Sequence, residues 1–243
     1  MNRRSDTILC SSAFGNSKFY DGIMRMRKSF IDNGYTGDFM LYIDQMPDGC
    51  PPHPVKNHQY TEGTVPYAFK AYMMKQAMDQ GYRYIYWVDS VIKLISSYEA
   101  LKSIIADIGY YFSNNGAILG EYTSDRCLRY FKMNREDIMS HYSFSSGIMF
   151  LDCHQIQCRT FIEMQYQTAF IGGPYCGHWH NRNNAVSDDP RVKGHRPHQS
   201  TVNLIALGLD MTRVQPNELL YKKISDPDQF YRFEMMEPED IAL

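Results

Sequence analysis

The chain has 243 residues, of which 44% are hydrophobic and 21% charged, and its formal net charge is −2. This composition is typical of a soluble globular protein, and the length allows one α/β domain whose core needs no disulfide or metal for stability. Membrane-spanning and general nucleic-acid-binding proteins are disfavoured, because no apolar run approaches ~18 residues and the net charge is not basic.

The N-terminal residues and the cysteines predict a cytoplasmic protein. The apolar run Ile8–Cys10 is far too short for the core of a signal peptide. The six cysteines are scattered and form no Cys-x-x-Cys pair, and a chain of this size does not need disulfides. We therefore expect reduced thiols and no membrane span.

The first residues predict a strand, a helix and a second strand, in that order. Residues 7–13 and 38–44 are apolar runs of strand length. Between them, apolar side chains recur at helical spacing as far as the helix-ending pair Asn33-Gly34, namely Phe19, Ile23, Met26 and Phe30. This order is that of a parallel crossover. Only Gly15 follows the first strand, so the three-glycine dinucleotide fingerprint is absent and a hydride-transfer enzyme is disfavoured.

A second helix leads into the most aromatic strand of the chain. After a loop at 45–54 and a short strand at 55–60, apolar residues at helical spacing predict a helix that ends at Gly81. Residues 82–88 are mostly aromatic or β-branched and predict a buried strand that ends at Asp89. Ligands of open α/β sheets bind at the carboxyl edge, so Asp89 is the first functional candidate. The alternative is that Asp89 only caps a turn.

The rest of the chain alternates between helices and strands and ends in a long loop, a helix and a tail. In chain order we predict an extended piece at 91–95, a helix at 98–108, a turn at 114–116, a strand at 117–122, mixed helix at 126–141, a strand at 145–152, a helix at 155–170, a loop at 171–197, a helix at 199–207 and a polar tail at 211–243 that folds back over the sheet. A long loop inside a compact domain is usually functional, and we interpret residues 171–197 as a lid. No linker or internal repeat divides the chain, which predicts a single domain.

Residues that suit a diphosphate and a divalent cation occur in three separate parts of the chain. They are Lys70 in the second helix, Asp89 at its strand end, and His195, Arg196 and His198 in a late segment. A carboxylate and imidazoles can hold a divalent cation, which would bridge the phosphates. The lysine and the arginine could neutralise the same phosphates, because Arg presents a planar fork to their oxygens and Lys a point charge.

Four stretches of the sequence carry a family resemblance. They are Tyr67-Ala68-Phe69-Lys70-Ala71, residues 81–92, Ser146-Gly147-Ile148-Met149-Phe150-Leu151, and Gly194-His195-Arg196 with Gln199-Ser200. Together they resemble the nucleotide-sugar-dependent glycosyltransferases of the GT-A type, over residues 7–208. In that family an aromatic-rich strand ends in an Asp-x-Asp motif that holds Mn²⁺ or Mg²⁺ on the diphosphate of the donor. A later strand of small and apolar residues lines the donor sugar and the acceptor, and a segment resembling GHRHDQS begins a helix near the site.

The resemblance implies a fold and an activity. The fold would be α/β, a single-domain GT-A (Rossmann-like) fold with a mixed, mainly parallel sheet flanked by helices. Residues 7–122 would form the nucleotide-binding half and residues 123–243 the half for the donor sugar and the acceptor. The activity would be that of a hexosyltransferase-like glycosyltransferase, which moves a sugar from a nucleoside-diphosphate sugar to an acceptor hydroxyl with the aid of Mn²⁺ or Mg²⁺. The acceptor stays open among a saccharide, a lipid-linked glycan, a protein and a modified nucleic acid.

The site residues that the resemblance implies fall into three groups. The donor-binding group has the end of the first strand for the base and ribose and the other residues for the phosphates and sugar: Ser11, Ser12, Ala13, Phe14, Lys70, Asp89, Ser90, Ser146, Gly147, Arg196 and Gln199. The metal ligands would be Asp89, His195 and His198. The catalytic group is Asp89 with Asp188 and Asp189; no motif marks Asp188, Asp189 or Glu121, which are candidates because an inverting reaction needs a base for the acceptor. The alternative for the Asp pair is a solvated loop.

Two departures from the family pattern affect this site. Val91 stands where the motif has its second carboxylate, so metal binding at this turn depends on Asp89 alone. Relatives with Asp-Ser-Ser in this place exist, so the loss does not exclude membership. Pro197 and His198 replace the second His and the Asp of the late segment. His198 could ligate a metal, orient the acceptor or simply cap the helix.

Other functions fit the sequence less well. A degenerate relative that binds a sugar or nucleotide without turnover is the main alternative, because of Val91. A nucleotidyltransferase would need a glycine-rich basic loop after the first strand. A zinc site at Cys176, His178 and His180 lacks an evident fourth ligand. A zinc deaminase lacks its His-x-Glu and Pro-Cys-x-x-Cys motifs, and a serine hydrolase lacks the elbow glycines.

Overall fold

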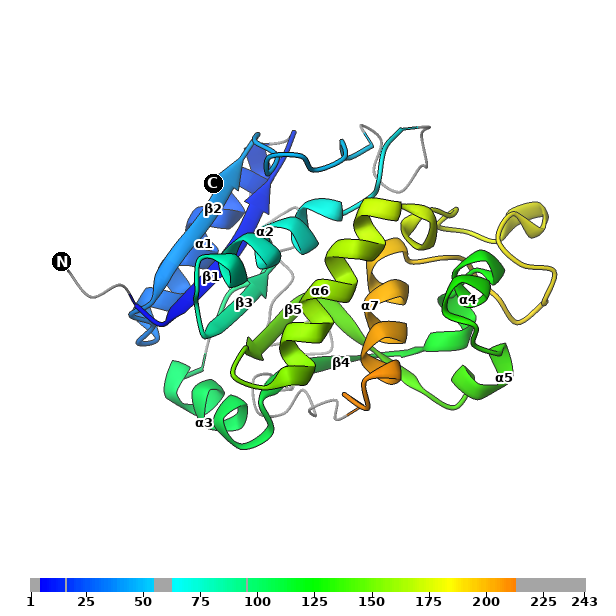
Figure 1. Cartoon of the computed structure of the whole chain (residues 1–243). Coiled ribbons are helices and arrows are strands. Elements are labelled where there is room, and N and C mark those ends of the chain that lie inside the picture. Colours follow the sequence, from blue (N-terminus) through cyan, green and yellow to red (C-terminus); the bar gives the residue numbers. More distant parts are fainter. Residues whose placement is uncertain (1–4, 16, 55–62, 95, 213–243) are drawn as a thin grey trace, which may run out of the picture.

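A five-stranded sheet forms the centre of the molecule in the computed structural model, which describes residues 5–15, 17–54, 63–94 and 96–212 (Figure 1). The strands are β1 (Thr7–Ala13), β2 (Asp38–Ile43), β3 (Tyr84–Val88), β4 (Tyr110–Ile118) and β5 (Tyr142–Asp152). The helices are α1 (Ser17–Asp32), α2 (Ala68–Asp79), α3 (Tyr98–Ile108), α4 (Asp125–Phe131), α5 (Arg135–Ile138), α6 (Ile156–Ile171) and α7 (Pro197–Gly208), with short 3₁₀ helices at Leu119–Tyr122, Gly173–Tyr175 and Arg182–Asn184.

The sheet is mixed, and most of its strands point the same way. The strand order is β2-β1-β3-β5-β4, with β1 parallel to β2 and to β3. Only β5 runs antiparallel to its neighbours β3 and β4. The predicted α/β fold with a mixed, mainly parallel sheet flanked by helices is therefore confirmed. Because β1 and β3 are parallel and adjacent, their carboxyl ends meet at the same edge of the sheet.

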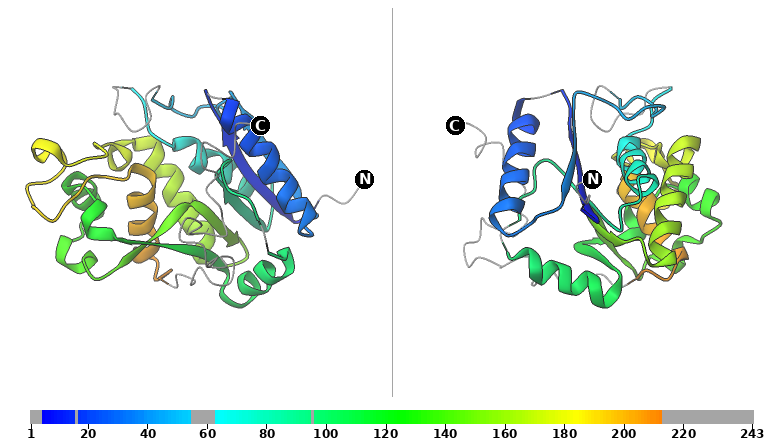
Figure 2. Two further views of the ribbon diagram at one scale, coloured as in Figure 1. Left: turned by 180° about the vertical axis from the view of Figure 1, so that it is seen from behind. Right: turned by 60° about the vertical axis from the view of Figure 1, so that its left-hand side comes forward.

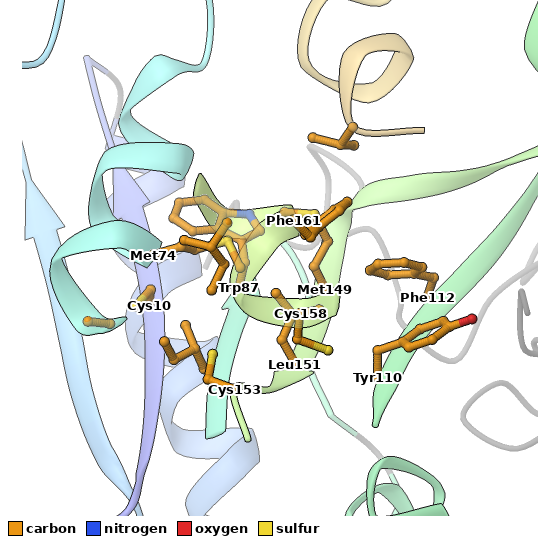
Figure 3. Close-up of a cluster of buried hydrophobic side chains, with 14 of the residues drawn as sticks. Cys10, Met74, Trp87, Tyr110, Phe112, Met149, Leu151, Cys153, Cys158 and Phe161 are labelled. Atoms are coloured by element: carbon orange, nitrogen blue, oxygen red, sulfur yellow. The ribbon is translucent and has the colours of Figure 1, made fainter. Parts of the chain in front are cut away.

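Helices cover both faces of the sheet, which explains the nearly continuous apolar run of β3. Figures 1 and 2 show α2, α6 and α7 on one face and α1 and α3 on the other. Side chains of a strand alternate between the two faces. Ile85 and Trp87 pack in the core under α2, whereas Tyr84, Tyr86 and Val88 pack under α1 and α3. Figure 3 shows Trp87 grouped with Met74 of α2, Met149 of β5 and Phe161 of α6.

The turn predicted at 114–116 is a bulge inside β4 instead. The ladder between β4 and β5 shifts register after Phe112 and again after Asn114. Asn114 accepts a hydrogen bond from the backbone N–H of Gly116, whose φ is 74°, and Asn115 accepts one from Ala117. The local turn chemistry was therefore read correctly, but the pairing with β5 keeps both sides of it in one strand. The predicted strand at 117–122 is wrong beyond Ile118, where a 3₁₀ helix follows.

Several other expectations were tested by the fold. Residue 91 lies in a turn and residues 92–94 form no regular secondary structure, whereas residue 95, the last of the expected extended piece, lies outside the described residues. The long loop at 171–197 is packed against the body of the protein, because Tyr175 and His195 are fully buried. Its role as a lid stays a prediction. The short strand expected at 55–60 and the tail beyond residue 212 lie outside the described residues.

No helix among the described residues combines the length and apolar character needed to cross a bilayer.

Candidate functional site

The main cavity of the described structure lies at the sheet edge where β1 and β3 end. Its volume is about 630 Å³, within the range of roughly 300–1,000 Å³ that is usual for small-molecule sites. It is lined by the ends of β1 and β3, the start of α2, the bulge of β4, the first half of β5 and the first turn of α7. The lining residues used below are Ser12, Ala13, Phe14, His53, Tyr67, Phe69, Lys70, Trp87, Asp89, Ser90, Val91, Asn114, Asn115, Ser146, Gly147, Trp179, Arg196, His198 and Gln199.

Asp89 points into this cavity because of strand alternation. It continues the series Ile85 and Trp87, whose side chains lie on the α2 face of the sheet. Its backbone N–H donates to the carbonyl of Gly147, which ties the end of β3 to β5. The side chain is 34% exposed, and the cavity wall supplies its partners. The prediction that a carboxylate stands at the carboxyl end of β3 is confirmed, and a mere turn cap does not account for the partners described next.

Lys70 forms a short ion pair with Asp89. Its Nζ lies 2.6 Å from Asp89 Oδ1 and 3.3 Å from the carbonyl oxygen of Ser146. The lysine is only 4% exposed, because it sits on the face of α2 that packs against the sheet, one helical turn before Met74. A lysine is almost never buried without a partner, so the ion pair is what allows this burial.

The two oxygens of Asp89 have different surroundings. Oδ1 accepts a second hydrogen bond, from Trp87 Nε1 at 2.7 Å. Oδ2 lies against Gly147, where an added Cβ would come within 2.9 Å of it. Gly147 is therefore required for room beside the carboxylate, which is a physical reason for the glycine that the sequence marked as part of the sugar pocket.

Arg196 brings a second cation to the cavity. It is the residue that precedes α7, and its guanidinium lies over the rings of Tyr122 at 4.5 Å and Trp179 at 5.3 Å. Its Nε is buried and has no hydrogen-bond partner among the described residues. Helix α7 is held in place by Asn203, which exchanges two hydrogen bonds with the backbone of Phe144 on β5. The Arg196 guanidinium therefore lies at the start of a well-anchored helix, and its Nε–H is available to donate a hydrogen bond to a ligand.

The end of β1 is only partly in the cavity. Ser12, Ala13 and Phe14 line it, and the Ser12 hydroxyl is buried without a hydrogen-bond partner among the described residues. Ser11 does not line it, since its side chain lies on the opposite face of the strand, toward α1. Phe14 packs on Phe69 with ring centroids 4.9 Å apart, so this end of the cavity is aromatic. Of the four residues expected to carry the base and ribose, the structure brings three to the cavity.

His195 is a structural residue rather than a cavity residue. It is fully buried, its Nδ1 accepts from the backbone N–H of Ser124 at 3.3 Å, and its Nε2 lies 2.9 Å from the carbonyl oxygen of Pro174. Burial lowers its pKa from 6.5 to about 4. Gly177 and His195 pack so closely that a Cβ on the glycine would lie 2.6 Å from the ring. Both nitrogens are therefore engaged, and the expectation that His195 ligates a metal is not supported.

His198 reaches the cavity but is poorly placed for a cation. Its Nε2 lies 3.3 Å from Oε1 of Gln165, and its buried Nδ1 has no hydrogen-bond partner among the described residues. Burial, and secondarily the charge of Lys70, holds its pKa well below 6.5. A cation that opposes protonation of this ring also opposes metal binding to it. The helix begins at Pro197, with Arg196 in the capping position, so His198 is not the cap either.

The donor set therefore does not fit the metal site expected from Asp89, His195 and His198. Within the part of the chain that the structure describes, no group of three or more His, Cys, Asp or Glu side chains could hold a metal ion. The same finding removes the zinc interpretation of Cys176, His178 and His180.

Asp188 and Asp189 lie away from the main cavity. Asp188 is exposed, accepts a hydrogen bond from Asn184 at 3.2 Å and lines a separate, smaller hollow. Asp189 pairs with Arg191 at 2.6 Å, and the hydrogen bonds from that arginine lower its pKa to about 2. A base must come within hydrogen-bond reach of the acceptor, so neither carboxylate suits the site around Asp89. Glu121 is likewise paired with Lys193, at 2.6 Å, outside the lining of the main cavity.

Ser90, Ser146, Gly147 and Gln199 line the cavity as expected. Several lining residues were not among the expected site residues, and they are aromatic or amide side chains: His53, Tyr67, Trp87, Trp179, Asn114 and Asn115. Of these six residues, only Trp87 could have been predicted from the sequence pattern. It stands two residues before Asp89, and strand alternation places both side chains on the same face. Trp179 comes from the loop interpreted as a lid, where no periodicity guides prediction.

No model of a known protein family matches this sequence, and no curated protein sequence matches it. Several solved structures are similar to it. Mouse xyloside xylosyltransferase 1 in its apo form has TM-score 0.46 and 10% identity, over 86% of this chain and 84% of that chain. Core-mannan synthase A from Aspergillus fumigatus, in its Mn/GDP form, has TM-score 0.46 and 11% identity, over 96% and 83%.

A glycosyltransferase involved in the glycosylation of the major capsid of PBCV-1 has TM-score 0.39 and 10% identity, over 67% of this chain. The chain spans 65% of that protein, just under two thirds. All three TM-scores are below 0.5, so these likenesses assign no activity. The case for a function rests on the cavity.

Proposed function

We propose that this protein is a glycosyltransferase that moves a sugar from a nucleoside-diphosphate sugar to an acceptor hydroxyl. One observation carries the proposal: Lys70, Asp89, Gly147, Arg196 and Gln199 all line one cavity, although they are widely separated in the sequence. They come from the four stretches in which the chain resembles GT-A glycosyltransferases. A resemblance of scattered residues gains weight when the fold gathers them at the carboxyl edge of a sheet, where α/β proteins bind ligands.

The chemistry asked of the site is charge stabilisation. The bond between the anomeric carbon and the diphosphate oxygen breaks, and its electron pair leaves with the nucleoside diphosphate. The acceptor oxygen forms the new bond to the same carbon, and its proton passes to a phosphate oxygen or to solvent. Lys70 and Arg196 would stabilise the negative charge that develops on the leaving group. The first turn of α7 lines the cavity beside Arg196, and the dipole of a helix favours an anion at that end.

The remaining lining residues suggest how the donor lies. Ser12 and Phe14 at the end of β1 would hold the ribose and base, with Phe69 beside them as a stacking surface. The Asp89 carboxylate would orient the Lys70 ammonium through Oδ1. Its Oδ2 would accept a hydrogen bond from a hydroxyl of the donor sugar. Gln199 would face the sugar.

A second candidate function is binding of a nucleotide or sugar without turnover. The observation that favours it is that no carboxylate other than Asp89 lines the main cavity in the described residues, and Oδ1 of Asp89 is already shared by two donors. Such a protein would keep the aromatic and cationic walls but lack a group to activate the acceptor.

A donor screen tests both candidates without knowledge of the acceptor. The purified chain is incubated with a panel of nucleoside-diphosphate sugars, and slow release of the nucleoside diphosphate is followed by chromatography. The proposal expects release from at least one donor, and its loss in Asp89→Ala. Asp188→Asn is the matched control, since it removes a carboxylate outside the cavity. Binding of a donor with no release would favour the non-catalytic alternative, and no binding of any donor would refute both.

A further inference from the structure

The Lys70 ammonium stands at Asp89 where a divalent cation would be expected. We infer that the site binds and neutralises the donor diphosphate with Lys70 and Arg196 and without a resident divalent cation. This inference rests on the proposed function and specifies how that site handles phosphate charge.

The first step of the argument is that Asp89 Oδ1 is already occupied. Lys70 Nζ at 2.6 Å and Trp87 Nε1 at 2.7 Å both donate to it. A metal ion on Oδ1 would have to displace a charge-assisted hydrogen bond, which is among the stronger contacts that a carboxylate makes.

The second step is that the surroundings of Lys70 hold its ammonium against Asp89. Its ammonium lies 5.4 Å from the ring centroid of Tyr67 and 5.2 Å from that of Trp87, and it also donates to the Ser146 carbonyl. The residue is 4% exposed, so leaving the carboxylate would strand a buried charge. A cation on Oδ2 instead would lie within roughly 5 Å of the ammonium, where like charges repel by several times the thermal energy.

The third step is the shortage of other ligands. Mg²⁺ and Mn²⁺ favour several oxygen ligands, and proteins hold Mg²⁺ through one or two carboxylates together with substrate phosphates and waters. Val91 lines the cavity where the family motif would place the second one. Both ring nitrogens of His195 are already hydrogen-bonded to the backbone. His198 is buried, and the positive charge of Lys70 opposes a second cation at its ring. The described residues offer no group of three His, Cys, Asp or Glu side chains that could form a metal site around Asp89.

The fourth step is that the cavity already carries cationic charge for a diphosphate. Lys70 and Arg196 line it together with the single carboxylate of Asp89. The Arg196 Nε is buried without a hydrogen-bond partner among the described residues, so a phosphate oxygen can satisfy it. The charge that a cation would supply in a two-carboxylate site is thus supplied by side chains.

The decisive experiment uses the unmodified chain. Isothermal titration calorimetry measures the binding of UDP and of GDP, first in excess EDTA and then with saturating Mn²⁺, and a separate titration uses MnCl₂ alone. We expect at least one nucleoside diphosphate to bind in EDTA, with an affinity that Mn²⁺ changes by less than about threefold (~0.7 kcal/mol). We also expect no stoichiometric binding of Mn²⁺ alone.

Nucleotide binding that requires Mn²⁺ would overturn the inference and leave the proposed function standing. Failure of every nucleoside diphosphate and sugar donor to bind under either condition would sink the proposed function itself. The two failures are therefore distinguishable.

A pair of variants tests the role of Lys70. Lys70→Met should weaken nucleoside diphosphate binding in EDTA by about tenfold or more, equivalent to ~1.4 kcal/mol. Lys75→Met is the matched control, because it removes a lysine from the same helix that pairs with Asp79 and Glu163 rather than with the cavity. If Lys70→Met does not fold, Lys70→Gln removes the charge but keeps a hydrogen-bond donor for Asp89, and gives the same measurement. Unchanged affinity in the folded variant would refute the inference.

Discussion

Removing the Asp89 charge should destabilise the fold as well as the site, because Lys70 would be left buried without an anionic partner. Loss of one member of a buried ion pair costs about 3–5 kcal/mol. The Lys70 side chain is 5% exposed and that of Asp89 34%, so solvent screens the pair from one side. We therefore expect Asp89→Asn to lower the free energy of unfolding by about 2–3 kcal/mol, or Tm by roughly 5–10 °C for a chain of this length.

A double-mutant cycle isolates the pair from other effects of each substitution. Lys70→Met should also destabilise, but by less, because Trp87 Nε1 still donates to the carboxylate. The double variant should be more stable than the sum of the single variants predicts, with a coupling of about 1–2 kcal/mol. Urea unfolding followed by far-UV circular dichroism gives these values, and tryptophan fluorescence checks that a second probe shows the same transition.

Two results would refute this reasoning. If Asp89→Asn is as stable as the unmodified chain, the Lys70 ammonium is compensated by something other than the carboxylate. If both single variants destabilise but the coupling is near zero, the two side chains contribute independently to the free energy of unfolding. The 2.6 Å contact between them then adds nothing to stability. Lys75→Met should shift Tm by much less than either variant, because its ion pairs lie at the surface, where such pairs contribute about 0–1 kcal/mol.

Three further predictions concern Gly147, Asp188 and His195. Gly147→Ala places a Cβ 2.9 Å from Asp89 Oδ2, so kcat/KM for donor hydrolysis should fall by about tenfold or more while the chain still folds. Asp188→Asn should leave that rate within about twofold, since the side chain is exposed and outside the cavity; a large loss would return it to the catalytic candidates. The folded state holds His195 neutral down to about pH 4, whereas the unfolded chain protonates it below 6.5. The His195 contribution to stability should therefore fall as pH drops from 6.5 to 4, by up to about 3 kcal/mol, and His195→Gln should reduce the slope of pH-dependent unfolding and leave the part due to His198.

Local patterns predicted the sheet and its functional edge well. The aromatic run before Asp89 became β3, and the helical spacing around Phe30 became α1, because burial on both faces of a strand and on one face of a helix leaves a periodic trace in the sequence. Gly147 was also identified in advance, although the reason for it, room beside a carboxylate, came only with the fold. At Asn114 and Asn115 the turn chemistry was read correctly and its consequence wrongly, because pairing with β5 outweighed it.

What no local pattern contained was the orientation of each side chain toward distant parts of the chain. Ser11 and Ser12 are neighbours with the same chemistry, yet only Ser12 reaches the cavity, since α1 covers one face of β1 and α2 the other. His195 has the right type for a metal ligand but turns toward Pro174. Residue types and hydrophobic periodicity therefore predicted an α/β sheet with a carboxylate at its edge. Only packing across the chain decided that the partner of this carboxylate is a lysine, because that contact joins two elements whose relative placement depends on the whole core.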